Sequence, residues 1–408
     1  MPSLHRNDAA HLKSEEKLRV LLVSIVPPKN DCGVRIVMHR QLVGDSPFEL
    51  HVASNANFED NLLVHTRVRL PYLIHRLRKS RFGPRLAAWI TDYENLIWPL
   101  TTNGALEGAV EDFKPDVVLT LAECGLCHVA RKTAERHGLP LVGLFLDWFP
   151  MMKGHYGHTL TRPILSRYYR ELYAACDLAF CTSDGMQEVL GPHPNSHVIY
   201  PMPGRHRLPE KSWLPPTGKF RLVYVGSVEN FYGRMLCSLI EKIEITSDLE
   251  IIVVGPNADW PPPILQRAKA NGIYLGFKPP EEAAAVLAGA DALLAVMSFE
   301  REYELFMRTS FTTKFLDYVA FGKPVILWGP EYCGPVRVAR KHGGAAAVST
   351  DDAGAVISLC RQIGGDTALS NELSKQALQL HETLFNPDRL QSIFVGEIEK
   401  LVAGRANQ

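Results

Sequence analysis

The sequence predicts an α/β protein whose two halves are each a doubly wound parallel sheet covered by helices. Short, mostly apolar segments alternate with helical segments along most of the chain, as in sheets of this kind. The alternation stops at a polar, proline-rich stretch and then starts again. The length of 408 residues suits two domains of ordinary size, and a hydrophobic share of 46% is normal for a folded protein.

The first half reads as a series of apolar strands of the kind that parallel sheets bury on both faces. We expect strands over residues 19–25, 48–53, 116–121, 140–146 and 178–182, helices over 34–42 and 125–137, and a closing segment at 198–201. Residues 202–218 follow as a linker, because four prolines and several charges suit a domain boundary.

In the second half the alternation resumes and ends in a helical tail. We expect strands over residues 220–225, 249–254, 273–275, 292–296 and 324–328, and helices over 281–289, 313–321, 371–383 and 389–403. This reading divides the chain into a first domain over 1–201, the linker over 202–218, a second domain over 219–383 and a tail over 384–408.

Composition excludes several classes of protein. Lys+Arg and Asp+Glu are 44 each, so no overall charge favours nucleic acid. No apolar run approaches the ~18 residues that span a bilayer, and residues 1–17 lack the apolar core of a signal peptide. The 8 cysteines, mostly in apolar contexts, give no disulfide framework. We therefore expect a cytoplasmic protein.

The segment 311–328 is the most informative part of the chain. Ser310, Thr312 and Thr313 lead into a predicted helix, whose first turns carry Lys314 and Asp317. Helix N-termini bind phosphate through free N–H groups, and Lys314 adds a positive charge there. Asp317 lies three residues further along the same helical face, where it could accept hydrogen bonds from a ribose. The segment predicts a site for a nucleoside diphosphate.

The same segment resembles the Ser-Lys-Leu-Phe-Glu-Tyr-Leu-Ala-x-Gly-Lys-Pro-Val-Ile stretch of nucleotide-sugar glycosyltransferases with the GT-B fold. It is most similar to the retaining glycosyltransferase family 4, also called glycosyl transferases group 1. The resemblance implies two Rossmann-like domains facing a cleft, with a C-terminal helix crossing back to the first domain. It also implies a role in carbohydrate biosynthesis, with a UDP- or GDP-sugar as donor substrate and no cofactor.

Other donor-site residues follow from the resemblance. The turn at Gly226 and Ser227 matches the one beside the sugar diphosphate in the family, and Gly226 lets backbone approach the phosphates. Phe277 and Lys278 match a segment that contacts the base. The basic residue that the family usually has after the glycine turn is missing here. Arg234 or Arg308 could supply that charge, and we prefer Arg308 because it lies just before the phosphate helix. One departure is Thr309, which stands where the family usually has a glutamate.

The first half is expected to supply the acceptor side and part of the chemistry. Gly33 fits the glycine loop that GT-B enzymes place at the cleft. Asp147 ends an apolar strand and matches the aspartate of a His-Asp-Trp-Trp-Pro segment of the family, although Leu146 replaces the histidine. We expect Asp147, Asp317 and His155 to be catalytic, and we expect no metal site.

The sequence thus predicts a glycosyltransferase that moves a sugar to a saccharide, lipid-linked or small-molecule acceptor, with retention. The absence of an Asp-x-Asp triplet favours catalysis without metal. Two alternatives stay open: a catalytically weak homologue that binds a nucleotide or a partner, and a nucleotide-sugar epimerase of the same fold. A nicotinamide dehydrogenase is a more distant alternative, and the lack of a Gly-x-Gly-x-x-Gly turn after the strand ending at Val254 is strong evidence against it.

A basic segment over residues 65–85 interleaves arginines with apolar side chains. Such segments can lie on anionic membranes, so peripheral contact with the inner face of a membrane is a further expectation. A solvated basic helix is the other interpretation.

Overall fold

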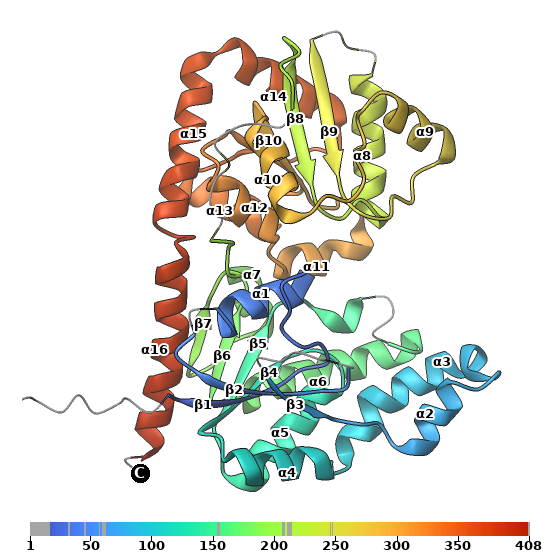
Figure 1. Cartoon of the computed structure of the whole chain (residues 1–408), viewed down its shortest axis with the longest axis vertical. Helices are drawn as coiled ribbons and strands as arrows, with labels where there is room; N and C mark the ends of the chain where they lie inside the picture. Colours follow the sequence, from blue (N-terminus) through green and yellow to red (C-terminus); the bar gives the residue numbers. More distant parts are fainter. Residues whose placement is uncertain are drawn as a thin grey trace, which may run out of the picture.

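The computed structural model describes residues 17–31, 33–44, 46–56, 58, 63–152, 156–205, 209, 214–244, 246 and 248–406. The chain forms two parallel sheets, one above the other in Figure 1, each flanked by helices. His155 lies outside the described residues.

The first sheet has seven strands in the order β3-β2-β1-β4-β5-β6-β7. Its strands are β1 (Arg19–Val23), β2 (Glu49–Ser54), β3 (Val64–Arg67), β4 (Val117–Leu121), β5 (Leu141–Phe145), β6 (Leu178–Cys181) and β7 (Ser196–Val198). Its α-helices are α1 (Gly33–Leu42), α2 (Tyr72–Arg78), α3 (Gly83–Asp92), α4 (Gly104–Phe113), α5 (Leu126–His137), α6 (Arg162–Ala175) and α7 (Asp184–Leu190). The short turns η1 (Tyr93–Ile97), η2 (Trp98–Leu100), η3 (Phe149–Met151) and η4 (Thr159–Thr161) complete this half.

The second sheet has five strands in the order β12-β11-β10-β8-β9. They are β8 (Phe220–Val225), β9 (Leu249–Val254), β10 (Ala292–Val296), β11 (Val325–Trp328) and β12 (Ala346–Val348). The helices are α8 (Asn230–Ile243), α9 (Pro262–Ala270), α10 (Pro280–Ala288), η5 (Arg301–Tyr303), α11 (Glu304–Thr309), α12 (Thr313–Val319), α13 (Gly334–His342) and α14 (Ala353–Gly365). The tail forms α15 (Thr367–Glu382) and α16 (Pro387–Ala406).

Most predicted strands are present, and one is corrected. Residues 273–275 form only an isolated bridge, between Tyr274 and Val253, rather than a strand. Gly272 and Gly276 flank this stretch, and both have positive φ, at 69° and 70°. The turns that they make leave too few extended residues for a ladder. The predicted closing segment, 198–201, overlaps the observed strand β7 (Ser196–Val198) only at Val198.

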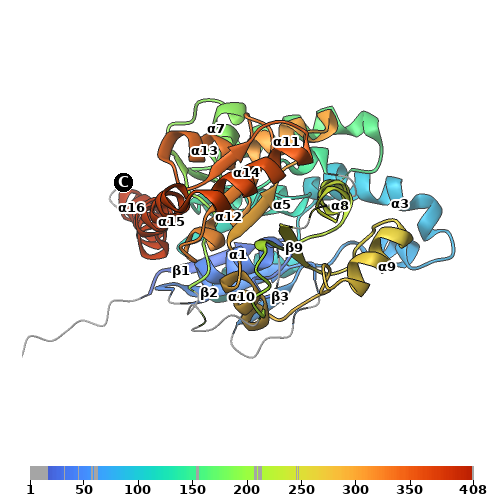
Figure 2. The ribbon, with the colours of Figure 1, turned by 90° about the horizontal axis from the view of Figure 1, so that it is seen from above.

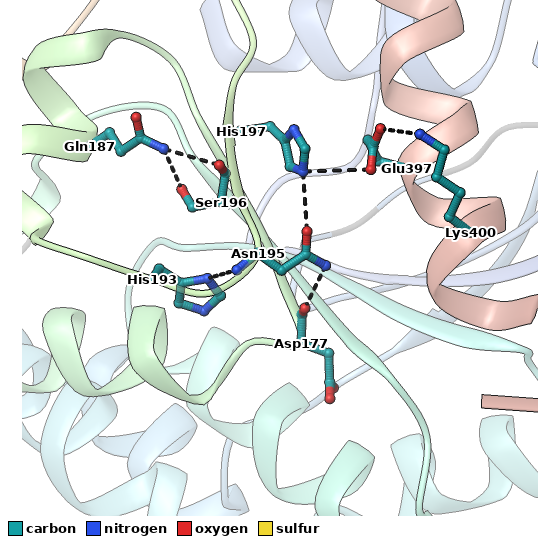
Figure 3. Close-up of polar contacts among 8 residues, drawn as sticks. All are labelled: Asp177, Gln187, His193, Asn195, Ser196, His197, Glu397 and Lys400. Carbon is teal, nitrogen blue, oxygen red and sulfur yellow. Dashed lines mark hydrogen bonds and ion pairs between the residues drawn. The ribbon is translucent and has the colours of Figure 1, made fainter. Parts of the chain in front are cut away.

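The last helix crosses back to the first sheet, as the resemblance implied. In Figure 1, α15 lies beside the upper sheet and α16 beside the lower one, and Figure 2 shows both at the same edge of the molecule. Glu397 of α16 lies 3.5 Å from His197 of β7, whose ring also contacts Asn195 at 3.1 Å (Figure 3). Farther along, Arg405 pairs with Asp177 at 2.6 Å.

Aromatic side chains fill the place where the two halves meet. The rings of Tyr200 and Phe311 lie 4.8 Å apart, and Phe385, between α15 and α16, lies 5.2 Å from Tyr200. Phe315 of α12 contacts the same group, at 5.3 Å from Phe385. One continuous buried cluster therefore extends from the first sheet to the second and supports α12 from below.

Candidate functional site

Helix α12 is fixed against the end of strand β8. The Tyr318 hydroxyl accepts a hydrogen bond from the Val225 N–H at 2.9 Å and donates one to the Val225 carbonyl at 3.0 Å. Phe315 and Leu316 are fully buried beneath the helix. These contacts hold the first turn of α12 over the turn that contains Gly226.

Gly226 gives Lys314 the room that it occupies. A Cβ atom at Gly226 would overlap Cε of Lys314, and the φ of Gly226 is 146°, where L side chains are strained. The group that lies closest to Gly226 is the Lys314 side chain, and the close approach of a phosphate to this glycine stays a prediction.

The Lys314 side chain lies against two tyrosine rings. Its Nζ is 4.5 Å from the ring centroid of Tyr232 and 5.4 Å from that of Tyr224, which are cation–π distances. Within the part of the chain that the structure describes, its ammonium makes no hydrogen bond or ion pair. Burial lowers the pKa of Lys314 to about 8, because removal from water disfavours the charged form.

Asp317, one turn later, is held by groups from other parts of the chain. Its Oδ1 accepts hydrogen bonds from Nη1 of Arg40 at 3.1 Å and from the Gly204 N–H at 2.8 Å. Arg40 belongs to α1 of the first half, and Gly204 follows the last strand of that half. The predicted ribose-binding carboxylate therefore lies where the two halves and the linker meet.

Lys314 and Asp317 both line a cavity of about 460 Å³ between the two halves. One wall is apolar and comes mainly from the end of β8 and from α10: Val225, Pro280, Ala283, Ala284 and Leu287. Arg40, Arg205 and Lys314 also line the cavity. An apolar wall in a cavity that also contains cations suits a flat base joined to phosphates.

Two carboxyl groups lie at the ends of neighbouring strands in the first half. Glu123 follows β4 and Asp147 follows β5, and these strands pair directly. Burial, and then the charge of Asp147, raise the pKa of Glu123 to about 7. Burial also raises the pKa of Asp147, while the Ser310 hydroxyl of the second half opposes that shift. Asp147 therefore lies near Ser310, just before α12, with Glu123 as its neighbour, and neither carboxyl is among the residues that line the cavity.

Several predicted site residues lie away from the cavity. The Phe277 side chain is 68% exposed, and Lys278 pairs with Glu282 at 3.1 Å. Arg308 lies 3.8 Å from Glu188 of the first half, rather than beside Lys314. Ser227 is exposed as well.

The remaining predicted residues lie at helix starts. Thr312 and Thr313 begin α12, and neither caps the helix through its side chain. Gly33 begins α1 with a φ of 56°. Thr309, which replaces an expected acid, is fully buried and donates its hydroxyl to the Leu305 carbonyl at 2.8 Å. It therefore offers no group to the cavity.

Sequence reasoning missed Arg40 and the two tyrosines around Lys314. Arg40 is 277 residues from its partner Asp317, and no local motif marks it. Tyr232 and Tyr224 read as ordinary core residues of a helix and a strand. Their only signal would have been the need of a buried lysine for neighbours that tolerate its charge.

The described ranges contain neither a grouped set of metal-binding side chains nor a helix that could span a membrane. There, no three His, Cys, Asp or Glu side chains are grouped so that they could hold a metal ion. None of the helices in the same ranges is long and apolar enough to cross a membrane.

Comparison with known proteins supports the fold. No protein-family model matches the sequence, and no curated protein is significantly similar to it. Anabaena Alr3699/HepE, solved in complex with UDP and glucose, has a TM-score of 0.64 at 12% identity, covering 94% of this chain and 100% of its own. Sucrose-phosphate synthase (tll1590) from Thermosynechococcus elongatus has a TM-score of 0.63 at 12% identity, covering 95% and 100%.

A third similar structure is a glycosyltransferase from Rickettsia africae ESF-5. Its TM-score is 0.62 at 14% identity, and the match covers 95% of this chain and 99% of that one. These matches extend over nearly the whole of each chain, and the two parallel sheets of seven and five strands agree with their shared fold. The chain has the GT-B fold.

Proposed function

We propose that this protein is a glycosyltransferase that takes a sugar from a nucleoside-diphosphate donor. The observation that carries the proposal is the state of Lys314. Lys314 lines the cavity, and its ammonium lies near the rings of Tyr232 and Tyr224. Among the described residues no carboxylate pairs with it. A partly buried cation without a counter-charge is unfavourable, so this side chain is suited to an anionic ligand.

In the proposed reaction, the bond between C1 of the sugar and the diphosphate oxygen breaks, and its electron pair leaves with the diphosphate. Lys314 stabilises the charge that develops there, an electrostatic effect that is strong in a partly dry site. The acceptor hydroxyl bonds to C1, and its proton passes to the oxygen of the departing diphosphate. We assign Asp147 and its neighbour Glu123 to the binding of that hydroxyl.

A uridine or guanosine diphosphate sugar is the donor that we propose. The apolar wall from β8 and α10 would face the base, and Asp317 would face the ribose. The complex of Alr3699/HepE with UDP-glucose, in the same fold, puts UDP-sugars first. The acceptor is a saccharide, a lipid-linked molecule or a small molecule.

Retention of configuration, membership of glycosyltransferase family 4 and a role in carbohydrate biosynthesis rest on the motif around Lys314. Catalysis without a metal agrees with a protein cation at the diphosphate position. His155 remains our predicted third catalytic residue.

We further propose that the protein works at the cytoplasmic face of a membrane and contacts it through α2 and α3. No residue of α2 is buried; Tyr72 and Leu73 are 72% and 75% exposed, and Trp89 of α3 is 66% exposed. Arginines and lysines interleave with them, so this surface fits anionic lipids. Co-sedimentation with phosphatidylglycerol vesicles that Leu73→Glu abolishes would support the contact; equal binding by wild type and variant would refute it.

The donor site is tested by thermal unfolding with UDP, GDP, ADP, dTDP and their sugar conjugates. A ligand that binds only the native state at 100 times its Kd stabilises it by about 2.7 kcal/mol. We expect one nucleotide to raise the Tm of the wild type and not that of Lys314→Met. Lys323→Met, four residues beyond α12 and outside the cavity, is the matched control.

Turnover then separates the three candidate activities. Transfer to an acceptor, or slow hydrolysis of the donor, supports a transferase. Interconversion of the free sugar nucleotide by NMR would indicate an epimerase. Tight nucleotide binding with no turnover would indicate a catalytically weak homologue. The observation that motivates this alternative is Thr309, whose buried hydroxyl is hydrogen-bonded to the Leu305 carbonyl where the family usually has a glutamate. Absence of any nucleotide binding would refute the proposal.

A further inference from the structure

Three separate parts of the chain meet at one oxygen of Asp317. Nη1 of Arg40, from α1, lies 3.1 Å from Oδ1 and also donates to the Met202 carbonyl at 3.2 Å. The Gly204 N–H donates to the same Oδ1 at 2.8 Å. The Arg40 side chain is 13% exposed and that of Asp317 is 23% exposed, so these contacts are shielded from water more than surface ion pairs are.

The second carboxylate oxygen is used much less. Oδ2 lies 3.5 Å from Nη1 of Arg40, and no other donor reaches it among the described residues. A carboxylate can accept about four hydrogen bonds, so Oδ2 keeps most of its capacity. Both side chains line the cavity between the two halves. The polar capacity left in Asp317 is therefore available to a ligand there.

We propose that Arg40 is a positioning residue of the donor site: with Gly204, it holds Oδ1 of Asp317 so that Oδ2 accepts a ribose hydroxyl. The inference rests on the proposed function. It adds that the nucleotide site is completed by the first half of the molecule, across 277 residues of sequence. A carboxylate fixed by two charge-assisted or short hydrogen bonds loses less freedom when it binds a hydroxyl, which strengthens that bond.

The same geometry makes ribose recognition depend on how the halves are placed. Lys314 and Asp317 come from α12, while Arg40 comes from α1. The diphosphate contact through Lys314 lies within the second half, where Tyr224 and Tyr232 also lie. Loss of Arg40 should therefore weaken recognition of the ribose and leave recognition of the diphosphate largely unchanged.

The test compares ribose with deoxyribose in a mutant cycle. Binding of the preferred nucleoside diphosphate and of its 2′-deoxy and 3′-deoxy forms is measured by calorimetry for wild type and Arg40→Met. A hydrogen bond to a charged group corresponds to about tenfold or more in affinity, so the wild type should lose about tenfold on one deoxy form. In Arg40→Met this penalty should fall to about threefold or less.

Two further variants make the result specific. Asp317→Ala should remove the deoxy penalty by itself, and Arg40→Met in that background should change it no further. Arg205→Met is the matched control, because Arg205 lines the same cavity but pairs with Asp388 at 2.6 Å; it should keep the full penalty. If Arg40→Met unfolds, Arg40→Gln takes its place, and its shorter side chain should also reduce the penalty.

The outcomes separate the two proposals. A full deoxy penalty in Arg40→Met, with nucleotide binding intact, overturns the role of Arg40 and leaves the proposed function standing. A similar loss of affinity for ribose and deoxyribose ligands would show a merely structural role and would also overturn it. Failure of the wild type to bind any nucleoside diphosphate overturns both.

Discussion

Replacement of Lys314 by methionine should make the ligand-free protein more stable while it removes nucleotide binding. The pKa of Lys314 falls from its ordinary value of 10.5 to about 8 because the side chain is buried. Each pH unit corresponds to about 1.4 kcal/mol, so the protonated lysine is less stable in this site than in water by about 3 kcal/mol. Methionine has a similar length and no charge, and it would avoid this penalty.

Part of that gain is offset. The tyrosine rings attract the ammonium at 4.5 and 5.4 Å, and such contacts contribute about 0.5–2 kcal/mol. We therefore expect Lys314→Met to raise the free energy of unfolding by about 1–2 kcal/mol at pH 7. Loss of the charged contact to phosphate should lower nucleotide affinity by at least about tenfold.

Urea unfolding at pH 7 and calorimetric titration with the preferred nucleotide measure the two effects. Lys323→Met, outside the cavity, should leave both nearly unchanged. The reasoning would be refuted by a variant that is destabilised by more than about 1 kcal/mol and still binds nucleotide like the wild type, because the lysine would then contribute to folding rather than to binding.

Three other predictions follow from the same region. Nucleotide affinity should fall as pH rises above about 8, because Lys314 then loses its proton. Over pH 8 to 10.5 the free energy of unfolding should rise, because the unfolded chain keeps that proton to a higher pH than the folded protein does. Binding and unfolding measurements across this range test both effects, and Lys314→Arg should flatten both pH profiles. Gly226→Ala should weaken nucleotide binding about tenfold and cost about 1–3 kcal/mol, since φ is 146° and the new Cβ meets Lys314; normal calorimetry and unfolding curves would contradict this. Glu123→Gln should stabilise the protein at pH 8 and not below pH 4.5. The pKa of Glu123 is raised to about 7 in the folded protein, so the wild type loses stability as pH rises from 4.5 to about 7. A difference in urea unfolding between variant and wild type that does not change with pH would argue against this.

Sequence reasoning found the strands whose apolar runs stand out: β4 and β5, which are fully buried, and also the edge strand β9, whose sequence is LEIIVV. The edge strands β3 and β12 were missed, because Val64–Arg67 is largely polar and Ala346–Val348 is only three residues long. An edge strand buries less, so its composition resembles that of a loop. The local sequence indicates which strands are buried, but it indicates only weakly which strands pair with one another.

The candidate site shows the same division. Gly226, Lys314 and Asp317 stand in motifs whose local geometry implies a phosphate and ribose site. In the structure Lys314 and Asp317 line one cavity, and Gly226 lies against the Lys314 side chain. Arg40 enters that site only through the packing of the two halves, which no spacing in the sequence encodes. Arg308 is near Lys314 in sequence, yet its guanidinium faces Glu188. Adjacency along a chain does not fix the direction of a long side chain on a short helix.

The aromatic cluster at Tyr200 and Phe385 has a mechanical consequence. The chain passes between the halves twice, after Tyr200 and again between α15 and α16, and the two rings at these crossings are 5.2 Å apart. A rotation of one half against the other strains these two connections least when its axis passes close to this point. The two crossings therefore favour a hinge motion of the halves over a motion in which one half slides along the other.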